Sequence, residues 1–441
     1  MKAVFLCGGV GKRMFPLVED KYLLDFLGKT LLEHQLEMAR KAGLEHFLVI
    51  GNPSNIERIG EITGKISGIE IELILQKRPL GIADALKSAE SYLDGDVLIV
   101  NPNDVFEVSA YSWLFQESDK ESAASYMLGY EVEDYFPGGY LAVDSVNGLK
   151  HIVEKPDPGD EPSHLVNILV HLHTEPRKLL EYIGNVDTTK DDVYECALDS
   201  LVKDGYKIKV VPYNGLWMPI KYPWHIFDVV RHFLDMNQPH VSASASISEK
   251  ATIEGKVIIA DNVRVMENAV VKGPVYIGPN SIIGGNALVR DHSHVGADCV
   301  IGYSTEIKNS YIGDSCWFHS NYIGDSIIGR GCSFGAGTVL ANFRFDEQNI
   351  SVRVADETID TGRDKFGSIV GDNCKTGINA SIMPGTRIGP HSVVGSHVCL
   401  ARDLEPDKII LSEPRYRILS NEVQLDEEKS SELRKKLGKL E

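Results

Sequence analysis

Between residues 247 and 307 the sequence places an aliphatic residue at every sixth position, often with a glycine directly after it. This period predicts a parallel β-helix, because each flat face of such a prism is one short strand whose aliphatic side chain points inward. Eleven positions in unbroken register do not arise by chance. They are Ile247, Ile253, Ile259, Val265, Val271, Ile277, Ile283, Val289, Val295, Ile301 and Ile307.

A second run with the same period spans residues 370–394. Between the runs the spacing first shortens to five, as from Ile307 to Ile312, and it is lost between Leu340 and Val370. Irregularity in a regular solenoid predicts a loop on one face, often the face that binds a ligand. The second run consists of Val370, Thr376, Ile382, Ile388 and Val394.

The first 235 residues alternate strand-like apolar runs with amphipathic runs of helical period. KAVFLC, residues 2–7, is typical of a buried strand, and residues 31–43 are typical of a helix that ends at Gly43. This alternation predicts a Rossmann-like α/β fold with a mostly parallel sheet, whose ligands bind beyond the carboxyl ends of the strands. The expected parts are therefore residues 1–235, residues 236–412 and a charged tail, residues 413–441.

The formal net charge of −18 argues against a nucleic-acid polymer or an anionic membrane surface as the main partner. It does not exclude a small phosphorylated ligand, which needs only a local group of cations. The seven cysteines are scattered without a CxxC pair, so neither a zinc ribbon nor a disulfide framework is indicated. No apolar run approaches the length of a membrane span, and we expect a cytoplasmic protein without a membrane partner.

A glycine-rich loop follows the first predicted strand, in the stretch FLCGGVGKRMFPL. Glycine lets backbone N–H groups approach a phosphate closely, and two cations come directly after the loop. Neither a dinucleotide GxGxxG pattern nor a Walker A loop fits, since the lysine is followed by arginine instead of serine or threonine. The loop residues are Gly8, Gly9, Gly11, Lys12 and Arg13.

Five segments in this order resemble the sugar-1-phosphate nucleotidylyltransferases: GGVGKRMFPL, QKRPLGIADAL, VNPNDVF, HIVEKP and GLWMPIKYPW. The resemblance implies that a hexose-1-phosphate attacks the α-phosphorus of a nucleoside triphosphate and releases pyrophosphate, with Mg²⁺ as cofactor. Catalysis would come mainly from positioning and electrostatics.

The resemblance also assigns roles to particular residues. It implies that the nucleotide contacts Gly8, Gly9, Gly11, Lys12, Gln76 and Gly81. Arg13 and Lys21 would neutralise the departing pyrophosphate, and Asp104 would bind the metal. The residues expected to contact the sugar phosphate are Gly139, Glu154, Lys155 and Asn167.

Three positions depart from this family's pattern. Lys12 and Ile82 stand where threonine is usual, and Pro219 stands where a second metal carboxylate is expected. Proline cannot bind a metal. Either Asp228 or Asp235 serves through a local shift of the alignment, or the metal site is incomplete.

The stretch FHSNYIGDSIIGRGCSFGAGTVLAN, residues 318–342, resembles the acetyltransferase half of the bifunctional enzymes that make UDP-N-acetylglucosamine, in the archaeal layout. This resemblance implies a left-handed coil and a homotrimer. It implies that His319 is the general base for attack of an amino group on acetyl-CoA, with Asn342 close to it. Ala336 would contact acetyl-CoA.

Arg290, Lys308 and Tyr322 match the amino-sugar-phosphate contacts of that family. Arg290 and Lys308 are three hexads apart, which is one full coil, so we expect them to stack on one face and to suit a phosphate. Ser333 and Gln348 depart from the pattern, since asparagine and lysine are usual there.

Three interpretations follow. In the first, the chain converts an amino-sugar-1-phosphate into a UDP- or dTDP-N-acetylamino sugar, with acetyl-CoA and then UTP or dTTP. In the second, only the acetyltransferase is active. In the third, which the departures at Pro219, Ile82, Ser333 and Gln348 motivate, the chain is a catalytically reduced regulatory paralogue that binds a sugar nucleotide. The sequence does not determine the base or the hexose, because those choices depend on a few contacts in a formed pocket.

Overall fold

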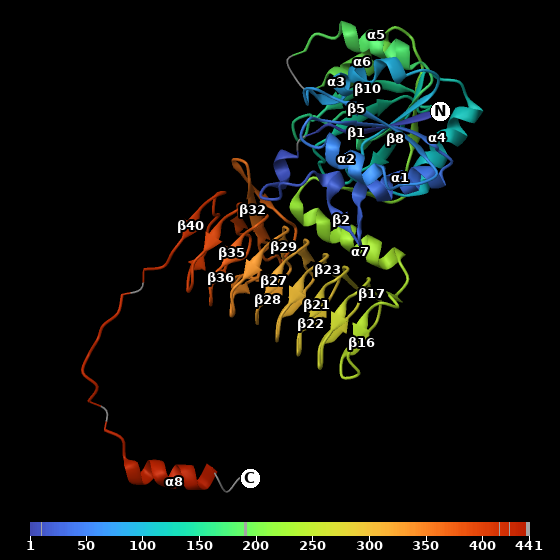
Figure 1. Ribbon diagram of the computed structural model, residues 1–441. Helices are drawn as coiled ribbons and strands as arrows, with labels where there is room; N and C mark the ends of the chain where they lie inside the picture. The colour runs from blue at the N-terminus through green and yellow to red at the C-terminus, as the bar shows by residue number, and fades with distance from the viewer. Residues whose placement is uncertain (10, 189–191, 414, 423, 438–441) are drawn as a thin grey trace.

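The computed structural model describes residues 1–9, 11–188, 192–413, 415–422 and 424–437, and of Lys12 and Leu437 only the backbone. An α/β domain lies against the side of a β-helix, and the C-terminal tail extends away from both (Figure 1). Both predicted fold classes are confirmed.

The α/β domain is built on a nine-stranded sheet with the path β10-β9-β11-β6-β1-β4-β5, to which β8 and β12 are added beside β11. Strands β6, β1, β4 and β5 are parallel, whereas β11 runs antiparallel to β6, β8 and β9. The sheet is therefore mixed, and its parallel half carries the glycine loop. The strands are β1 Lys2–Cys7, β4 His46–Gly51, β5 Glu70–Leu75, β6 Val97–Val100, β8 Ser125–Glu131, β9 Gly139–Val143, β10 Leu149–Glu154, β11 Leu165–His173 and β12 Ile208–Pro212.

Helices cover both faces of this sheet, as the alternation predicts. One apolar core lies beneath α1, α2 and α4, and a second lies beneath α3, α5 and α6. Helix α1 begins with a capping box between Thr30 and Glu33 and is followed by Gly43 at φ +94°, which is why the predicted stop is correct. The helices are α1 Leu31–Lys41, α2 Ile56–Thr63, α3 Gly81–Ser88, α4 Val108–Lys120, α5 Pro176–Asn185 and α6 Val193–Lys203.

The β-helix consists of three parallel sheets of two- and three-residue strands, with eight, nine and eight strands. One sheet runs from β14 His240–Val241 to β37 Arg387–Ile388, the next from β15 Ser246–Ile247 to β40 Ile409–Ile410, and the third from β16 Thr252–Glu254 to β39 Cys399–Leu400. From Ile259 onward, the aliphatic residues of both six-residue series lie in one buried core along the prism.

The irregular segment between Leu340 and Val370 forms a β-hairpin, β32 Ser351–Val354 paired with β33 Glu357–Asp360. Its residues Ile350 and Val352 are buried in a core shared with the N-terminal domain. The predicted loop therefore serves as a contact between the domains.

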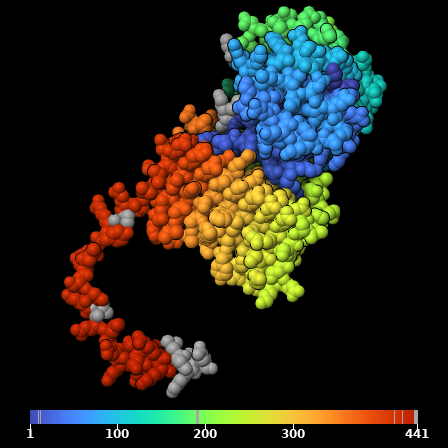
Figure 2. Space-filling view, in the orientation of Figure 1, coloured from blue at the N-terminus to red at the C-terminus, as the bar shows by residue number. Residues whose placement is uncertain are grey.

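Helix α7, Ile226–Met236, connects the domains and lies along the β-helix (Figure 1). The predicted boundary at residue 235/236 falls at its last turn. Its apolar side packs with Tyr276 and Tyr311 of the β-helix, and the two domains meet along a continuous surface (Figure 2).

The described part of the tail contains α8, Glu427–Leu437, whose described side chains are almost all exposed. No described helix is long and apolar enough to cross a membrane.

Candidate active sites

The glycine loop begins where β1 ends, at one wall of a cleft of about 190 Å³. A Cβ atom on Gly8 would lie 1.8 Å from Oε1 of Gln76, so a larger residue there would displace the Gln76 side chain, whereas a Cβ on Gly9 would meet nothing within 4 Å. The cleft is lined by Leu6, Gly8, Gly9, Gln76, Pro79, Gly81, Ile82, Ala85, Asn101, Asn103 and Leu169. Four predicted nucleotide contacts thus share one cavity.

Gln76 is buried and fixed by its amide nitrogen, which donates to the Gly81 carbonyl at 3.1 Å and to Asp84 Oδ2 at 2.9 Å. Gly81 has φ +85°, a conformation that favours glycine at the start of α3. These bonds set one edge of the cleft.

The predicted catalytic cations lie beside Gly11. A Cβ on Gly11 would lie 3.6 Å from Cε of Lys21, and Arg13 is in the short helix Lys12–Met14. The pKa of Lys21 is lowered to about 8, mainly by burial and also by the nearby cations Lys221 and Arg13, while Asp104 acts to raise it. The Lys12 side chain lies outside the described residues.

Asp104 begins β7, Asp104–Phe106, which pairs with β13, Trp217–Pro219, so that Pro219 lies directly opposite Asp104. Burial raises the pKa of the Asp104 carboxyl, while Lys221 and a hydrogen bond from Trp217 Nε1 to Oδ2 at 3.0 Å lower it. Within the described residues no three His, Cys, Asp or Glu side chains gather into a metal cluster.

The proposed substitutes for the missing carboxylate have other partners. Asp228 accepts two bonds from Arg363 Nη2, at 2.7 and 2.9 Å, in the contact between the domains. The backbone carbonyl of Asp235 accepts from Lys256 of the β-helix. Neither aspartate is placed by these contacts beside Asp104.

A single Mg²⁺ nevertheless fits the donors present. Asp104 offers a carboxylate, and the adjacent Asn103 has a buried Oδ1 without a partner in the described part of the chain. Magnesium in phosphate-transfer sites is held by one or two carboxylates together with substrate phosphate oxygens and water.

Lys221, which the sequence analysis did not single out, belongs to the same site. Its ammonium group lies 4.7 Å from the centre of the Phe136 ring, and both Asp104 and Glu154 act to raise its pKa against the stronger lowering effect of burial. The signal was available in the stretch GLWMPIKYPW, as a cation two positions after Pro219.

The predicted sugar-phosphate contacts converge from three strands. Gly139 of β9 pairs with Glu154 of β10, and a Cβ on Gly139 would lie 3.1 Å from Glu154 Oε2 and 3.5 Å from Cβ of Asn167 on β11. Lys155 has φ +47°, and its ammonium group forms an ion pair with Glu154 at 2.7 Å. Glycine at 139 leaves the space between the two polar side chains open.

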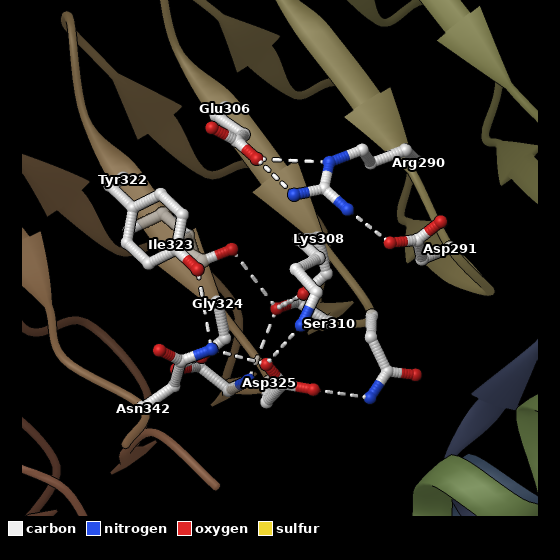
Figure 3. Close-up of polar contacts among 12 residues, drawn as sticks. Arg290, Asp291, Glu306, Lys308, Ser310, Tyr322, Ile323, Gly324, Asp325 and Asn342 are labelled. Carbon is white, nitrogen blue, oxygen red and sulfur yellow. Dashed lines mark hydrogen bonds and ion pairs between the residues drawn. The ribbon is translucent and has the colours of Figure 1, made fainter. Parts of the chain in front are cut away.

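In the β-helix, Arg290 of β22, Leu288–Arg290, pairs directly with Lys308 of β25, Glu306–Lys308, so the predicted stacking is confirmed. Figure 3 shows that both cations already have carboxylate partners. Arg290 donates to Glu306 at 2.9 and 2.7 Å and also contacts Asp291. A phosphate bound here competes with these carboxylates, which the sequence analysis overlooked.

Asp325 is the polar centre of this group (Figure 3). It is 3% exposed and accepts from Lys308 at 3.0 Å, from Asn309 at 2.7 Å and from Asn342. Asn342 also donates to the Tyr322 hydroxyl at 3.2 Å. The structure thus joins the predicted residues Lys308, Tyr322 and Asn342 through the carboxylate of Asp325, which was not among the predicted site residues.

His319 is exposed at the corner after β27, Trp317–Phe318, where its backbone N–H donates to Asn321 Oδ1 at 2.5 Å. The corner that carries Ala336 lies on the next coil, since the Gly337 N–H donates to the Ser320 carbonyl at 3.2 Å. His319 and Ala336 are therefore on adjacent corners. Asn342 bonds to Tyr322 and Asp325 and not to His319.

Comparison with known proteins identifies both halves. The family "Nucleotidyl transferase" matches residues 2–218, and "Bacterial transferase hexapeptide (six repeats)" matches residues 256–291 and 367–402. These matches and the two sites define a nucleotidyltransferase joined to a hexapeptide acetyltransferase.

Two curated relatives match over nearly their whole length. The chain is 37% identical over 414 residues to "Bifunctional protein GlmU" of Methanococcus maripaludis, covering 93% of this chain and 97% of the relative. It is 32% identical over 416 residues to "Bifunctional sugar-1-phosphate nucleotidylyltransferase/acetyltransferase" of Sulfurisphaera tokodaii, covering 92% and 98%. The chain belongs to this family of bifunctional GlmU-like enzymes.

Proposed function

We propose that this enzyme acetylates an amino-sugar-1-phosphate from acetyl-CoA in its β-helix, and then transfers a nucleotidyl group from UTP or dTTP to the acetylated sugar phosphate in its α/β domain. The observation that carries the second step is that one strand connects the nucleotide cleft to the predicted sugar-phosphate contacts. Leu169 of β11 lines the nucleotide cleft, and Asn167, two residues away, adjoins Gly139 and Glu154.

In the nucleotidyl step, backbone N–H groups of Gly8, Gly9 and Gly11 bind the triphosphate. Asn167 and Glu154 hold the sugar, whose phosphate attacks in line at the α-phosphorus. Arg13 and Lys21 stabilise the negative charge that develops on the departing pyrophosphate. When bound at Asp104, Mg²⁺ supplies further neutralisation of that charge.

In the acetyl step, His319 removes a proton from the sugar amino group as it attacks the thioester carbonyl of acetyl-CoA. The neighbouring corner at Ala336 binds the acetyl-CoA, and Arg290 and Lys308 hold the sugar phosphate. We propose a homotrimer assembled through the β-helix, which would cover the exposed side chains of Tyr303 and Trp317 on adjacent coils and of Ile378 two coils further on.

The test measures both products. The purified chain is given Mg²⁺, each of four nucleoside triphosphates and several hexose-1-phosphates, with and without acetyl-CoA, and pyrophosphate and free CoA are recorded. Release of both supports the bifunctional enzyme, and His319→Ala should abolish CoA release while Asp104→Asn should abolish pyrophosphate release. Free CoA without pyrophosphate would leave an acetyltransferase alone, and neither product would favour the regulatory paralogue.

A further inference from the structure

A chain of hydrogen bonds runs through the interior of the α/β domain and ends at Asn167. Ser125 Oγ lies 2.7 Å from Nδ1 of His173, and Nε2 of His173 lies 2.8 Å from the hydroxyl of Tyr194. That hydroxyl lies 2.7 Å from Nδ1 of His171, and Nε2 of His171 lies 2.7 Å from Oδ1 of Asn167. The four inner residues are at most 2% exposed.

The chain requires both histidines to be neutral. Burial lowers the pKa of His173 to about 3, and burial together with the neighbouring His173 lowers that of His171 well below its ordinary value. Each ring therefore carries one proton, donates through one nitrogen and accepts through the other.

One direction of donation satisfies every group. The Ser125 hydroxyl donates to His173, His173 donates to Tyr194, Tyr194 donates to His171, and His171 donates through Nε2 to Asn167 Oδ1. In the reverse direction the Ser125 hydroxyl hydrogen would have no acceptor in the described part of the chain, and an unpaired buried donor costs about 1–3 kcal/mol.

This direction determines what Asn167 offers to a ligand. Because its Oδ1 already accepts from His171, its NH₂ group is the part of the amide that remains for a ligand in the space beside Gly139 and Glu154. A rotated amide would present an acceptor beside the Glu154 carboxylate, which is also an acceptor.

We propose that His171 is a positioning residue for the nucleotidyl-transfer reaction: it holds the Asn167 amide so that the NH₂ group donates to an oxygen atom of the sugar phosphate. This inference rests on the proposed function, in which Asn167 contacts the sugar. Tyr194, His173 and Ser125 fix the tautomer of His171, and the pocket selects hexose phosphates that place a hydroxyl or phosphate oxygen at this amide.

The kinetic test compares His171→Leu, His171→Gln and Tyr194→Phe. Loss of the donor in His171→Leu should raise KM for the hexose-1-phosphate about tenfold, the effect of about 1.4 kcal/mol, and leave KM for the nucleoside triphosphate unchanged. Glutamine can still donate to Asn167 and should restore most of the loss. Tyr194→Phe removes only the hydroxyl that sets the tautomer, so it should give a smaller increase in the same KM.

Val170→Ala is the matched control for a purely structural effect. It shortens a fully buried side chain of the same strand and should lower the unfolding temperature without changing the ratio of the two KM values. If His171→Leu and Tyr194→Phe change both KM values in parallel, or neither, the positioning role is wrong.

A second readout does not depend on activity. In the free wild-type protein with ¹⁵N-labelled histidine, assigned with the His171→Gln and His173→Gln variants, both histidines should carry the proton on Nε2 and none on Nδ1. Protonated Nδ1 on His171 would overturn the proposal even in an active enzyme. If the wild type releases no pyrophosphate, the proposed function fails, while the tautomer still decides how Asn167 is oriented.

Discussion

Lys21 has a position and a pKa that together make its charge sensitive to a bound phosphate. It lies against Gly11, so its charge is next to the glycine loop, and its pKa of about 8 means that the charge is held only weakly in the free protein. A bound triphosphate would supply negative charge that raises the pKa of Lys21 and keeps the lysine protonated.

We therefore predict that kcat/KM for the nucleoside triphosphate falls as pH rises through about 8, because kcat/KM reports the free enzyme and a neutral lysine cannot stabilise the leaving pyrophosphate. Lys21→Arg, which keeps its charge at every pH used, should lack this fall even if its rate is lower. Pyrophosphate release from pH 6.5 to 9.5 measures both. Lys41→Arg on the exposed side of α1 is the control, and an unchanged profile in Lys21→Arg would assign the fall to another group.

The contacts of individual site residues differ in how well the sequence predicts them. The stacking of Arg290 on Lys308 was predictable because one coil is 18 residues long there and the register admits no alternative. The carboxylates that pair with them and the place of Lys221 beside Asp104 were not predictable, since these contacts depend on side-chain directions in a formed pocket. For the same reason the sequence did not indicate that Asn342 bonds to Tyr322 and Asp325 and not to His319.

At the scale of elements, β11 has two histidines in a strand that otherwise buries apolar side chains such as Val170 and Leu172. The alternation in the sequence predicts a mostly parallel sheet and does not indicate that this antiparallel strand connects the nucleotide cleft to the predicted sugar-phosphate contacts. Period-two apolar patterns predict a strand but not its direction, which depends on the connections that precede it.

The same histidines make the stability of the domain depend on pH. Their pKa values are lowered in the folded state, so below about pH 6.5 the unfolded chain binds protons that the folded chain does not. The free energy of unfolding should thus be fully retained above about pH 6.5 and fall by about 1.4 kcal/mol per pH unit per histidine at lower pH, for His173 down to its folded pKa of about 3.

Urea unfolding of the wild type and of His173→Gln between pH 7.5 and 5 measures this effect. The variant should be less stable at pH 7.5 but should lose less stability on acidification. The slope of its free energy of unfolding against pH should be smaller than that of the wild type by up to about 1.4 kcal/mol per pH unit, the contribution of one proton. His240→Gln, at an exposed position, should keep the wild-type slope. Equal slopes in the wild type and His173→Gln would mean that His173 is protonated in the folded chain.

For the whole molecule, the contact between the domains is the feature that the sequence predicted least. It joins residues far apart in the chain: Arg330 to Glu19, His294 to Asp25 at 3.3 Å, and Arg363 to Asp228. Hexapeptide period and strand alternation each describe one domain, and neither contains information on how α7 and the β32–β33 hairpin pack together. The predicted loop between Leu340 and Val370 is present as a segment with the β32–β33 hairpin, but the sequence did not indicate that this segment packs against the N-terminal domain.

Arg363 offers the sharpest test of this contact. Its guanidinium donates to both Asp228 oxygens and lies 5.3 Å from the centre of the Phe227 ring. Because both charged groups are partly exposed, we expect Arg363→Ala to cost only about 1–2 kcal/mol and Asp228→Asn, which keeps the ring contact, to cost less.

The measurement is scanning calorimetry of the full chain. A contact that couples the domains makes them unfold together, so Arg363→Ala should lower the first transition and separate it from the second, and Asp228→Asn should do so to a smaller extent. Arg344→Ala is the matched control, because Arg344 pairs with Asp346 within its own loop and both are exposed. If Arg344→Ala and Arg363→Ala give the same trace, the pair contributes nothing to coupling, and the apolar surface shared by α7 and the hairpin must hold the domains together by itself.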